Sequence, residues 1–207
     1  YGLRRIARRE TEQPFMLCVS FTGPHYPYRA PQRYWDMYSD EDVDLPEIPD
    51  NYAELEHEYV RWLRRHGSFD RLVPDEVCRN ARRAILGRIT MLDDYLGRIL
   101  GLLKETGLDE DTIVVYTSDH GDMMGEHGLW FKNAAYDWSS RVPLIISGPG
   151  IPAQRLSEVV SLLDLGPTLC ALAGIEPAYA VSDGRDLEPL VRGHRAEEDG
   201  LAIMENY

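Results

Sequence analysis

TIVVYTSDHGDMMGEHGLWFK, residues 112 to 132, is the stretch that decides the fold. Its first five residues are mostly apolar and β-branched, which predicts a buried strand. Three acids, two histidines and a lysine follow at once, in a segment interrupted by glycines. Because ligands in open α/β sheets bind where loops leave the carboxyl ends of the strands, this segment is a candidate functional loop.

Two more apolar runs predict buried strands, at residues 15–21 (FMLCVSF) and 141–147 (RVPLIIS). Before the central strand, residues 84–104 predict a long helix, because apolar side chains recur at helical spacing from Ile85 to Leu103. Continuous apolar strands that alternate with helices are typical of a parallel sheet. The chain is therefore predicted to be an α/β protein with a largely parallel sheet sandwiched by helices.

Other signals place the remaining elements. Residues 31–53 are rich in Pro, Asp and Tyr, which predicts a long surface loop, and a second helix is predicted over about 52–65. Gly107 is predicted to end the long helix. After the third strand, Asp164 is predicted to cap a helix that ends at Gly174.

Composition and charge exclude some classes of partner. With 43% hydrophobic and 28% charged residues, the 207-residue chain has the composition of an ordinary globular protein. No apolar stretch approaches the length of a membrane span. The formal net charge of −13 argues against nucleic acid as a partner, because a phosphate backbone requires a basic surface. A local cationic pocket could still bind a small anionic substrate.

The cysteines and the termini give limited information. Cys18, Cys78 and Cys170 form no C-x-x-C pair, and the first and last of them lie in apolar runs, which predicts thiols in the core. This pattern favours a reducing compartment such as the cytoplasm. The chain begins YGLRR and ends IMENY, and both ends are expected to be cuts, so the absence of a targeting signal decides nothing.

Two loops carry the candidate site: PHYPY (24–28) after the first strand and residues 117–132 after the second. Asp119 and His120 offer a carboxylate oxygen and an imidazole nitrogen that could converge on one cation at the tight turn of Gly121. The alternative is that Asp119 caps the turn and His120 is an ordinary surface residue.

His25 and Lys132 also have alternatives, as a hydrogen-bonded loop histidine and a solvated surface lysine. Three other titratable residues of the loop are predicted to shape it rather than to react: Asp122, Glu126 and His127. Nearby aromatic side chains could line a pocket for an aryl or quaternary-ammonium group or could simply pack: Tyr26, Tyr28, Trp130 and Trp138.

Taken together, these motifs resemble the sulfatases of the alkaline-phosphatase-like superfamily. The resemblance spans about residues 13–193 and has the family's order of motifs. The DH pair resembles most the bacterial choline-sulfatase and phosphonate-monoesterase-like branch, since many other sulfatases carry Asn in place of His120. Five stretches carry the resemblance: PHYPY (24–28), residues 112–132, SSRVPLIISGPG (139–150), SLLDLGPTLCALAGI (161–175) and DGRDLEPLVRG (183–193).

The resemblance implies an alkaline-phosphatase-like fold and a sulfuric ester hydrolase. Asp119 and His120 would be two ligands of a divalent cation, with Ca²⁺ favoured and Mn²⁺ possible because an imidazole nitrogen is less typical of a calcium site. Lys132 would contact the sulfate and the leaving-group oxygen, and His25 would assist turnover of the covalent intermediate. The substrate would be a small-molecule sulfate ester, attacked by a formylglycine made from Cys or Ser.

The chain departs from the family pattern in its nucleophile. The formylglycine signature is C-x-P-S-R or S-x-P-x-R, whereas Cys78 stands in CRNARR and neither Cys18 nor Cys170 fits better. The acidic pair that normally supplies the other metal carboxylates is also missing. The formylglycine is therefore expected outside this chain, and the 207 residues alone are expected to be inactive.

These departures lead to an expected domain organisation. Residues 1–195 would be the C-terminal portion of the catalytic α/β domain, with a loop and helical excursion at 31–83. Residues 196–207 would begin the segment that leads to a C-terminal subdomain. Two other functions stay open: a phosphonate monoester or phosphodiester hydrolase of the same superfamily, and a non-catalytic module that retains the fold. The oligomeric state is not predicted.

Overall fold

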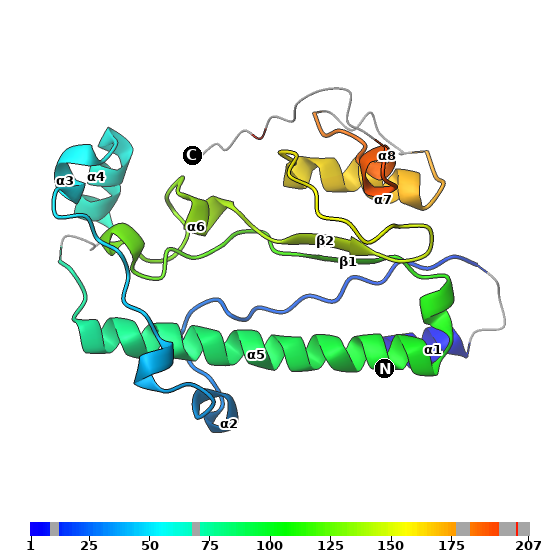
Figure 1. Cartoon of the computed structure of the whole chain (residues 1–207), viewed down its shortest axis with the longest axis horizontal. Coiled ribbons are helices and arrows are strands. Elements are labelled where there is room, and N and C mark those ends of the chain that lie inside the picture. The colour runs from blue at the N-terminus through cyan, green and yellow to red at the C-terminus, as the bar shows by residue number, and fades with distance from the viewer. Residues whose placement is uncertain (9–12, 68–70, 177–182, 195–201, 203–207) are drawn as a thin grey trace. The chain divides into compact units, whose positions relative to one another are not determined.

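The computed structural model describes residues 1–8, 13–67, 71–176, 183–194 and 202 (Figure 1). The chain divides into two compact units. Unit 1 comprises residues 1–109 and 120–142, and unit 2 comprises residues 110–119 and 143–207. Apart from residue 202, the predicted segment 196–207 lies outside the described residues. None of the described helices combines the length and the apolarity that a membrane span requires.

Unit 1 is helical and is built along one long helix, α5 (Asp75–Glu105). This helix confirms the one predicted over 84–104, but it begins at Asp75 because Pro74 occupies the N-cap and acids fill the first turn. It ends where Gly107 adopts a left-handed φ of 69°, as predicted. The other helices of this unit are short: α1 (Gly2–Ala7), α2 (Gln32–Trp35), α3 (Tyr52–Leu55), α4 (Glu58–His66) and α6 (Asp137–Ser140). The 3₁₀ turns are η1 (Asp40–Asp42) and η3 (Glu126–Gly128), and a third, η2 (Leu108–Glu110), lies where the two units meet in the sequence.

The helix predicted over 52–65 is two helices, α3 and α4. The chain is extended at Glu56, with ψ of 137°, and His57 then caps α4 by accepting a hydrogen bond from the Tyr59 amide at its Nδ1. The break allows the Glu56 side chain, only 6% exposed, to turn inward and pair with Arg64. The predicted surface loop at 31–53 contains the short helix α2, whose Tyr34 is buried.

A small apolar core ties α4 to the loop that carries the candidate site. Its buried members come from both segments: Val60, Leu63, Met123, Leu129 and Ala134. Met123 and Leu129 are fully buried, so this loop is not a surface excursion but part of the interior of unit 1. Burial of apolar side chains on both sides of the polar loop residues holds that loop in place.

Residues 15–21 do not form the predicted buried strand. They are extended (Figure 1). Phe21 stacks on Tyr95 of α5 with ring centroids 6.0 Å apart. Met16 is 80% exposed and Val19 48% exposed, and Cys18 is exposed rather than in the core. The prediction was wrong for a physical reason: a run that is apolar on both faces needs neighbouring strands, and the described residues supply none for it.

Unit 2 contains the two strands that the structure describes, β1 (Val114–Thr117) and β2 (Leu144–Ser147). They confirm the predicted strands at 112–116 and 141–147 within a few residues. They pair antiparallel, with Val114 opposite Ser147 and Thr117 opposite Leu144. This described pair is therefore not part of the predicted parallel arrangement.

The rest of unit 2 covers this strand pair. Leu187, Leu190 and Val191, around α8 (Glu188–Val191), pack with Leu144 and Ile146 of β2. The 3₁₀ turn η4 (Leu162–Asp164) leads directly into α7 (Leu165–Leu172).

Asp164 stands at the N-cap of α7 as predicted, and Gly174 follows the helix with φ of 66°. The buried Asp164 carboxylate accepts hydrogen bonds from the Ser161 amide at 2.9 Å and the Arg185 amide at 2.7 Å. It therefore joins the η4 turn to the segment at Arg185 instead of capping α7 with its side chain.

Candidate active site

Three of the four predicted site residues converge in unit 1. The Lys132 Nζ lies 3.2 Å from His25 Nε2 and 2.8 Å from His120 Nε2. His25 comes from the 24–28 loop, and the other two come from the two ends of the 120–132 loop. The structure thus confirms that both predicted loops meet, and it brings a lysine cation between two imidazoles.

The hydrogen bonds of the two imidazoles fix their tautomers. His120 Nδ1 lies 2.7 Å from the Gly121 carbonyl oxygen, and His25 Nδ1 lies 3.0 Å from the Tyr26 carbonyl oxygen. A carbonyl oxygen only accepts, so each Nδ1 carries the hydrogen and donates it. Each Nε2 therefore presents a lone pair, and both lone pairs face the ammonium of Lys132.

Asp119 follows β1 by two residues, with an exposed side chain, and is the last residue of its segment of unit 2. Its peptide bond to His120 is the point at which the chain passes into unit 1. Its role as a metal ligand stays a prediction.

Whether a divalent cation could bind at this site depends on the donor atoms of its side chains. A carboxylate oxygen from Asp119 and the Nε2 of His120 are both common ligands of divalent cations. Across the described ranges of the chain, no group of three or more histidine, cysteine or acidic side chains is placed to hold a metal ion. In this structure the Nε2 lone pair of His120 accepts from Lys132, so a cation at His120 would have to replace that hydrogen bond, and the two residues would supply at most two positions of a coordination shell.

Asp122 organises the loop between the two halves of the site. Its Oδ2 accepts a hydrogen bond from the Tyr28 hydroxyl at 2.8 Å, and its Oδ1 accepts from the amides of Met124 at 2.9 Å and Phe131 at 3.2 Å. Burial raises the pKa of Tyr28 well above its ordinary value, and the charge of Asp122 raises it further. The Tyr28 hydroxyl is thus a permanent donor to Asp122.

Glu126 is buried and lies in an ion pair with Arg82 of α5. The two side chains meet at 2.9 Å, and the other Glu126 oxygen accepts from the Glu47 amide at 2.8 Å. Arg82 also donates to the Met124 carbonyl at 3.2 Å and pairs with the exposed Asp44. The predicted role of Asp122 and Glu126, to shape the loop, is confirmed by these contacts.

A second buried arginine holds the far side of the loop. Arg64 of α4 pairs with Glu56 at 2.6 Å and donates to the carbonyls of His127 and Gly128. The ring of His127 stacks on Tyr136 with centroids 4.5 Å apart, and its structural role stays a prediction. Sequence reasoning missed both Arg64 and Arg82, because neither belongs to a motif and both stand in helices rich in arginine.

The aromatic residues separate into packed and exposed members. Trp130 is only 8% exposed and lies 5.7 Å from Tyr28, so it packs, as the alternative interpretation holds. Tyr26 is 51% exposed, stacks on His25 at 4.5 Å and tilts against Phe131 at 4.8 Å. An aromatic ring is therefore available beside His25 and Lys132.

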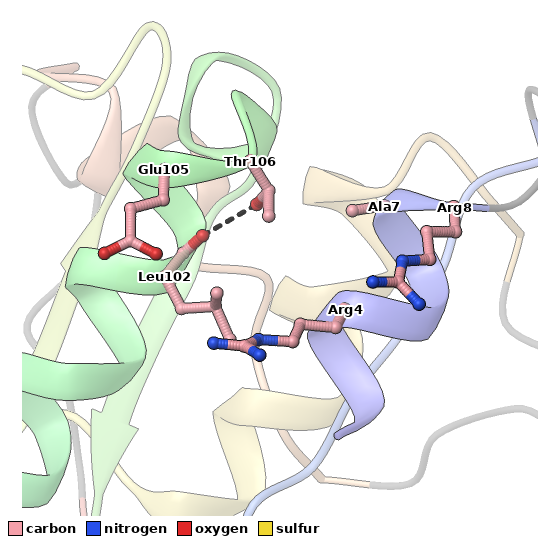
Figure 2. A pocket seen from close by; sticks show the side chains of 6 residues that line it. All are labelled: Arg4, Ala7, Arg8, Leu102, Glu105 and Thr106. Carbon is pink, nitrogen blue, oxygen red and sulfur yellow. Dashed lines mark hydrogen bonds between the residues drawn. The ribbon is translucent and has the colours of Figure 1, made fainter.

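A shallow pocket of about 260 Å³ lies at another place in unit 1, between α1 and the end of α5 (Figure 2). It contains none of the predicted site residues, and the Thr106 hydroxyl within it donates to the Leu102 carbonyl of its own helix at 2.7 Å. We assign it no role in the candidate site. Its lining residues are Arg4, Ala7, Arg8, Leu102, Glu105 and Thr106.

Comparison with known proteins identifies the family of this constellation. A family model described as Sulfatase matches residues 2–175. The chain belongs to the sulfatase family. It is 40% identical over 206 residues to the choline-sulfatase of Rhizobium meliloti, a match that covers 97% of this chain and 40% of that protein. It is 36% identical over 191 residues to the arylsulfatase of Clostridium perfringens, with coverages of 90% and 39%.

Among solved structures, the sulfatase chain is similar to the phosphonate monoester hydrolase of Agrobacterium radiobacter. The TM-score is 0.81 at 28% identity, and the match covers 95% of this chain and 41% of that one. The alkaline-phosphatase-like fold is thereby confirmed, as is the predicted relation to the choline-sulfatase and phosphonate-monoesterase branch. The chain spans about 40% of the length of the relatives it matches.

Proposed function

We propose that this chain carries one part of the active site of a metal-dependent sulfuric ester hydrolase, whose nucleophile lies in sequence outside these 207 residues. The observation that carries the proposal is the position of Lys132 Nζ between the Nε2 atoms of His25 and His120. Membership of the sulfatase family supports the same reaction. We refer to the protein that contains these residues, together with the regions its relatives have beyond the match, as the complete enzyme.

We assign Lys132 to the leaving-group oxygen of the ester. An ammonium has three N–H donors, and within the described part of the chain two of those of Lys132 meet acceptors, both imidazole nitrogens. A substrate oxygen can accept the third hydrogen bond. Such a preorganised donor stabilises charge that develops on the departing oxygen and can transfer a proton to it.

We assign His25 to proton transfer on the same side of the substrate. Its Nδ1 is held on the Tyr26 carbonyl, so its Nε2 lone pair is fixed in the direction of Lys132. A substrate oxygen bound to Lys132 would lie within reach of this nitrogen. His25 can therefore accept a proton during turnover without first having to rotate.

Asp119 and His120 would hold a divalent cation as two of its ligands, and the cation would replace Lys132 at the Nε2 of His120. When bound, such a cation would withdraw charge from the sulfate oxygens and so favour attack on sulfur. We propose Ca²⁺, with Mn²⁺ as the second candidate because one donor is an imidazole nitrogen. The family's formylglycine has no matching signature at Cys18, Cys78 or Cys170.

The substrate that we propose is a small-molecule sulfate ester, in line with the relatives named choline-sulfatase and arylsulfatase. A phosphonate monoester is the second candidate, because the chain superimposes on a phosphonate monoester hydrolase with a TM-score of 0.81. Both esters have a tetrahedral centre with anionic oxygens, which the cationic Lys132 would attract equally well. The net charge of −13 argues against nucleic acid as a partner.

The assignment is tested by substitution in the complete enzyme. Lys132→Ala and His25→Ala should each lower kcat for a sulfate ester by about 100-fold or more. Matched controls are Lys104→Ala, at the only other lysine of the chain, and His66→Ala, at an exposed histidine of α4. Equal activity of the Lys132 and Lys104 variants would sink the assignment.

The competing functions are separated by substrate choice. A higher kcat/KM for a sulfate ester than for the matched phosphonate ester supports the sulfatase, and the reverse order supports the second candidate. Hydrolysis of neither ester by the metal-loaded complete enzyme would favour a non-catalytic module. The isolated 207-residue chain should show no turnover, because it lacks the nucleophile.

A further inference from the structure

We propose that Asp122 is a positioning residue, which sets Lys132 against His25 by joining the two segments that carry them. The inference rests on the proposed function, since it concerns the same site. It adds a residue to the four that the proposed function uses. Its carboxylate binds both the hydroxyl of Tyr28 and the backbone of the 122–131 loop.

The two connections from Asp122 to the reactive side chains are short. Tyr28 follows His25 by three residues within the PHYPY loop, and its hydroxyl donates to Asp122 Oδ2 at 2.8 Å. Phe131 immediately precedes Lys132, and its amide donates to Asp122 Oδ1 at 3.2 Å. One carboxylate therefore fixes the backbone beside both partners of the Lys132–His25 contact.

The backbone of the loop needs this support. Met124 has φ of 49° and Phe131 has φ of 67°, and this left-handed region is unfavourable for residues with a Cβ atom. The amides of these two residues are the ones that donate to Asp122 Oδ1. Such strained residues persist only where the surroundings hold them, and they cluster at functional sites. Without the carboxylate, Phe131 would relax and Lys132 would move with it.

Tyr28 is suited to be the link because its ring is already fixed. It lies 5.7 Å from Trp130 and 6.3 Å from Phe131, between centroids, so its position does not depend on the hydroxyl alone. Tyr28→Phe therefore removes the hydrogen bond to Asp122 and keeps the packing. Asp122→Ala removes the acceptors for the loop amides as well. Tyr38→Phe is a matched control, since the Tyr38 hydroxyl bonds to Thr90 at 2.6 Å away from the site residues.

The test compares two sulfate esters in the complete enzyme, one with a poor alkyl leaving group and one with a good aryl leaving group. If Asp122 positions Lys132, Tyr28→Phe should lower kcat about tenfold for the alkyl ester and about threefold or less for the aryl ester, because the aryl leaving group needs less help from Lys132. Asp122→Ala should lower kcat about 100-fold for the alkyl ester. Tyr38→Phe should change neither. An equal fall for both esters, or none in Tyr28→Phe, overturns the proposal.

Crystal structures of the variants separate this inference from the proposed function. In Tyr28→Phe the distance between Lys132 Nζ and His25 Nε2 should exceed the 3.2 Å of the unaltered chain, and in Tyr38→Phe it should not. If the unaltered enzyme hydrolyses neither ester, the proposed function fails and the structures alone decide about Asp122. An unchanged distance in Tyr28→Phe then overturns its positioning role.

Discussion

The buried ion pair between Arg82 and Glu126 should control how often the site loop opens. The two side chains are 8% and 6% exposed and meet at 2.9 Å. Arg82→Met would leave the Glu126 carboxylate buried without its cation. Loss of one partner of a buried pair costs about 3–5 kcal/mol, because the remaining charge stays desolvated. Asp44 pairs with the same guanidinium at 2.9 Å but is 81% exposed, so Asp44→Asn should cost about 0–1 kcal/mol.

Hydrogen exchange of the loop amides in the complete enzyme measures this difference locally. The amides of Met123 and Gly125 donate within the loop, to Phe131 at 2.7 Å and to Leu129 at 2.8 Å, and they exchange only when the loop opens. Arg82→Met should accelerate their exchange by roughly 100-fold or more, and Asp44→Asn by about fivefold or less. Similar rates in the two variants would refute the argument that burial makes the Glu126 pair dominant.

Three further outcomes are expected. Gly121→Ala should destabilise the complete enzyme by about 1–3 kcal/mol, since its Cβ would lie 2.0 Å from the Trp138 carbonyl oxygen. Gly97→Ala, with open space around its Cβ on α5, should stabilise it by about 0.5–1 kcal/mol; thermal unfolding of both variants provides the check. Burial raises the pKa of Cys78, so at a given pH less of it is thiolate than of an unperturbed thiol. Mass spectrometry after alkylation at pH 8 should find the exposed Cys18 modified first and Cys78 last, with the rate at Cys78 rising as the pH is raised.

Local patterns predicted the elements that depend on local forces. The core of α5 follows from its helical periodicity and its end from Gly107, but the periodicity does not reach back to Asp75, where Pro74 sets the start. Apolar runs predicted β1 and β2 but contain no information on direction, so their antiparallel pairing was missed. The apolar run at 15–21 indicates that its side chains need to be buried. It does not indicate whether other residues of this chain bury them.

The candidate site, too, was predicted only in part from the sequence. Motif residues led to His25, His120 and Lys132, and the structure brings them together. The supporting arginines could not be found from the sequence. In the sequence, Arg64 and Arg82 look like ordinary polar residues of helices. A buried arginine can be recognised only from the carboxylate and carbonyl oxygens that it contacts in the folded chain.

Residues outside the loop at 122–131 hold its backbone, so its geometry cannot be transferred with its sequence alone. Its carbonyls are bound by arginines of two different helices, and its amides by Asp122 and by the carbonyl of Glu47. A designer who transplanted the DHGDMMGEHGLWFK string onto another scaffold would transfer the order of the side chains and lose their geometry. A working graft would also have to carry Arg64 and Arg82 on correctly placed helices, so the smallest portable unit of this site is a tertiary assembly and not a peptide.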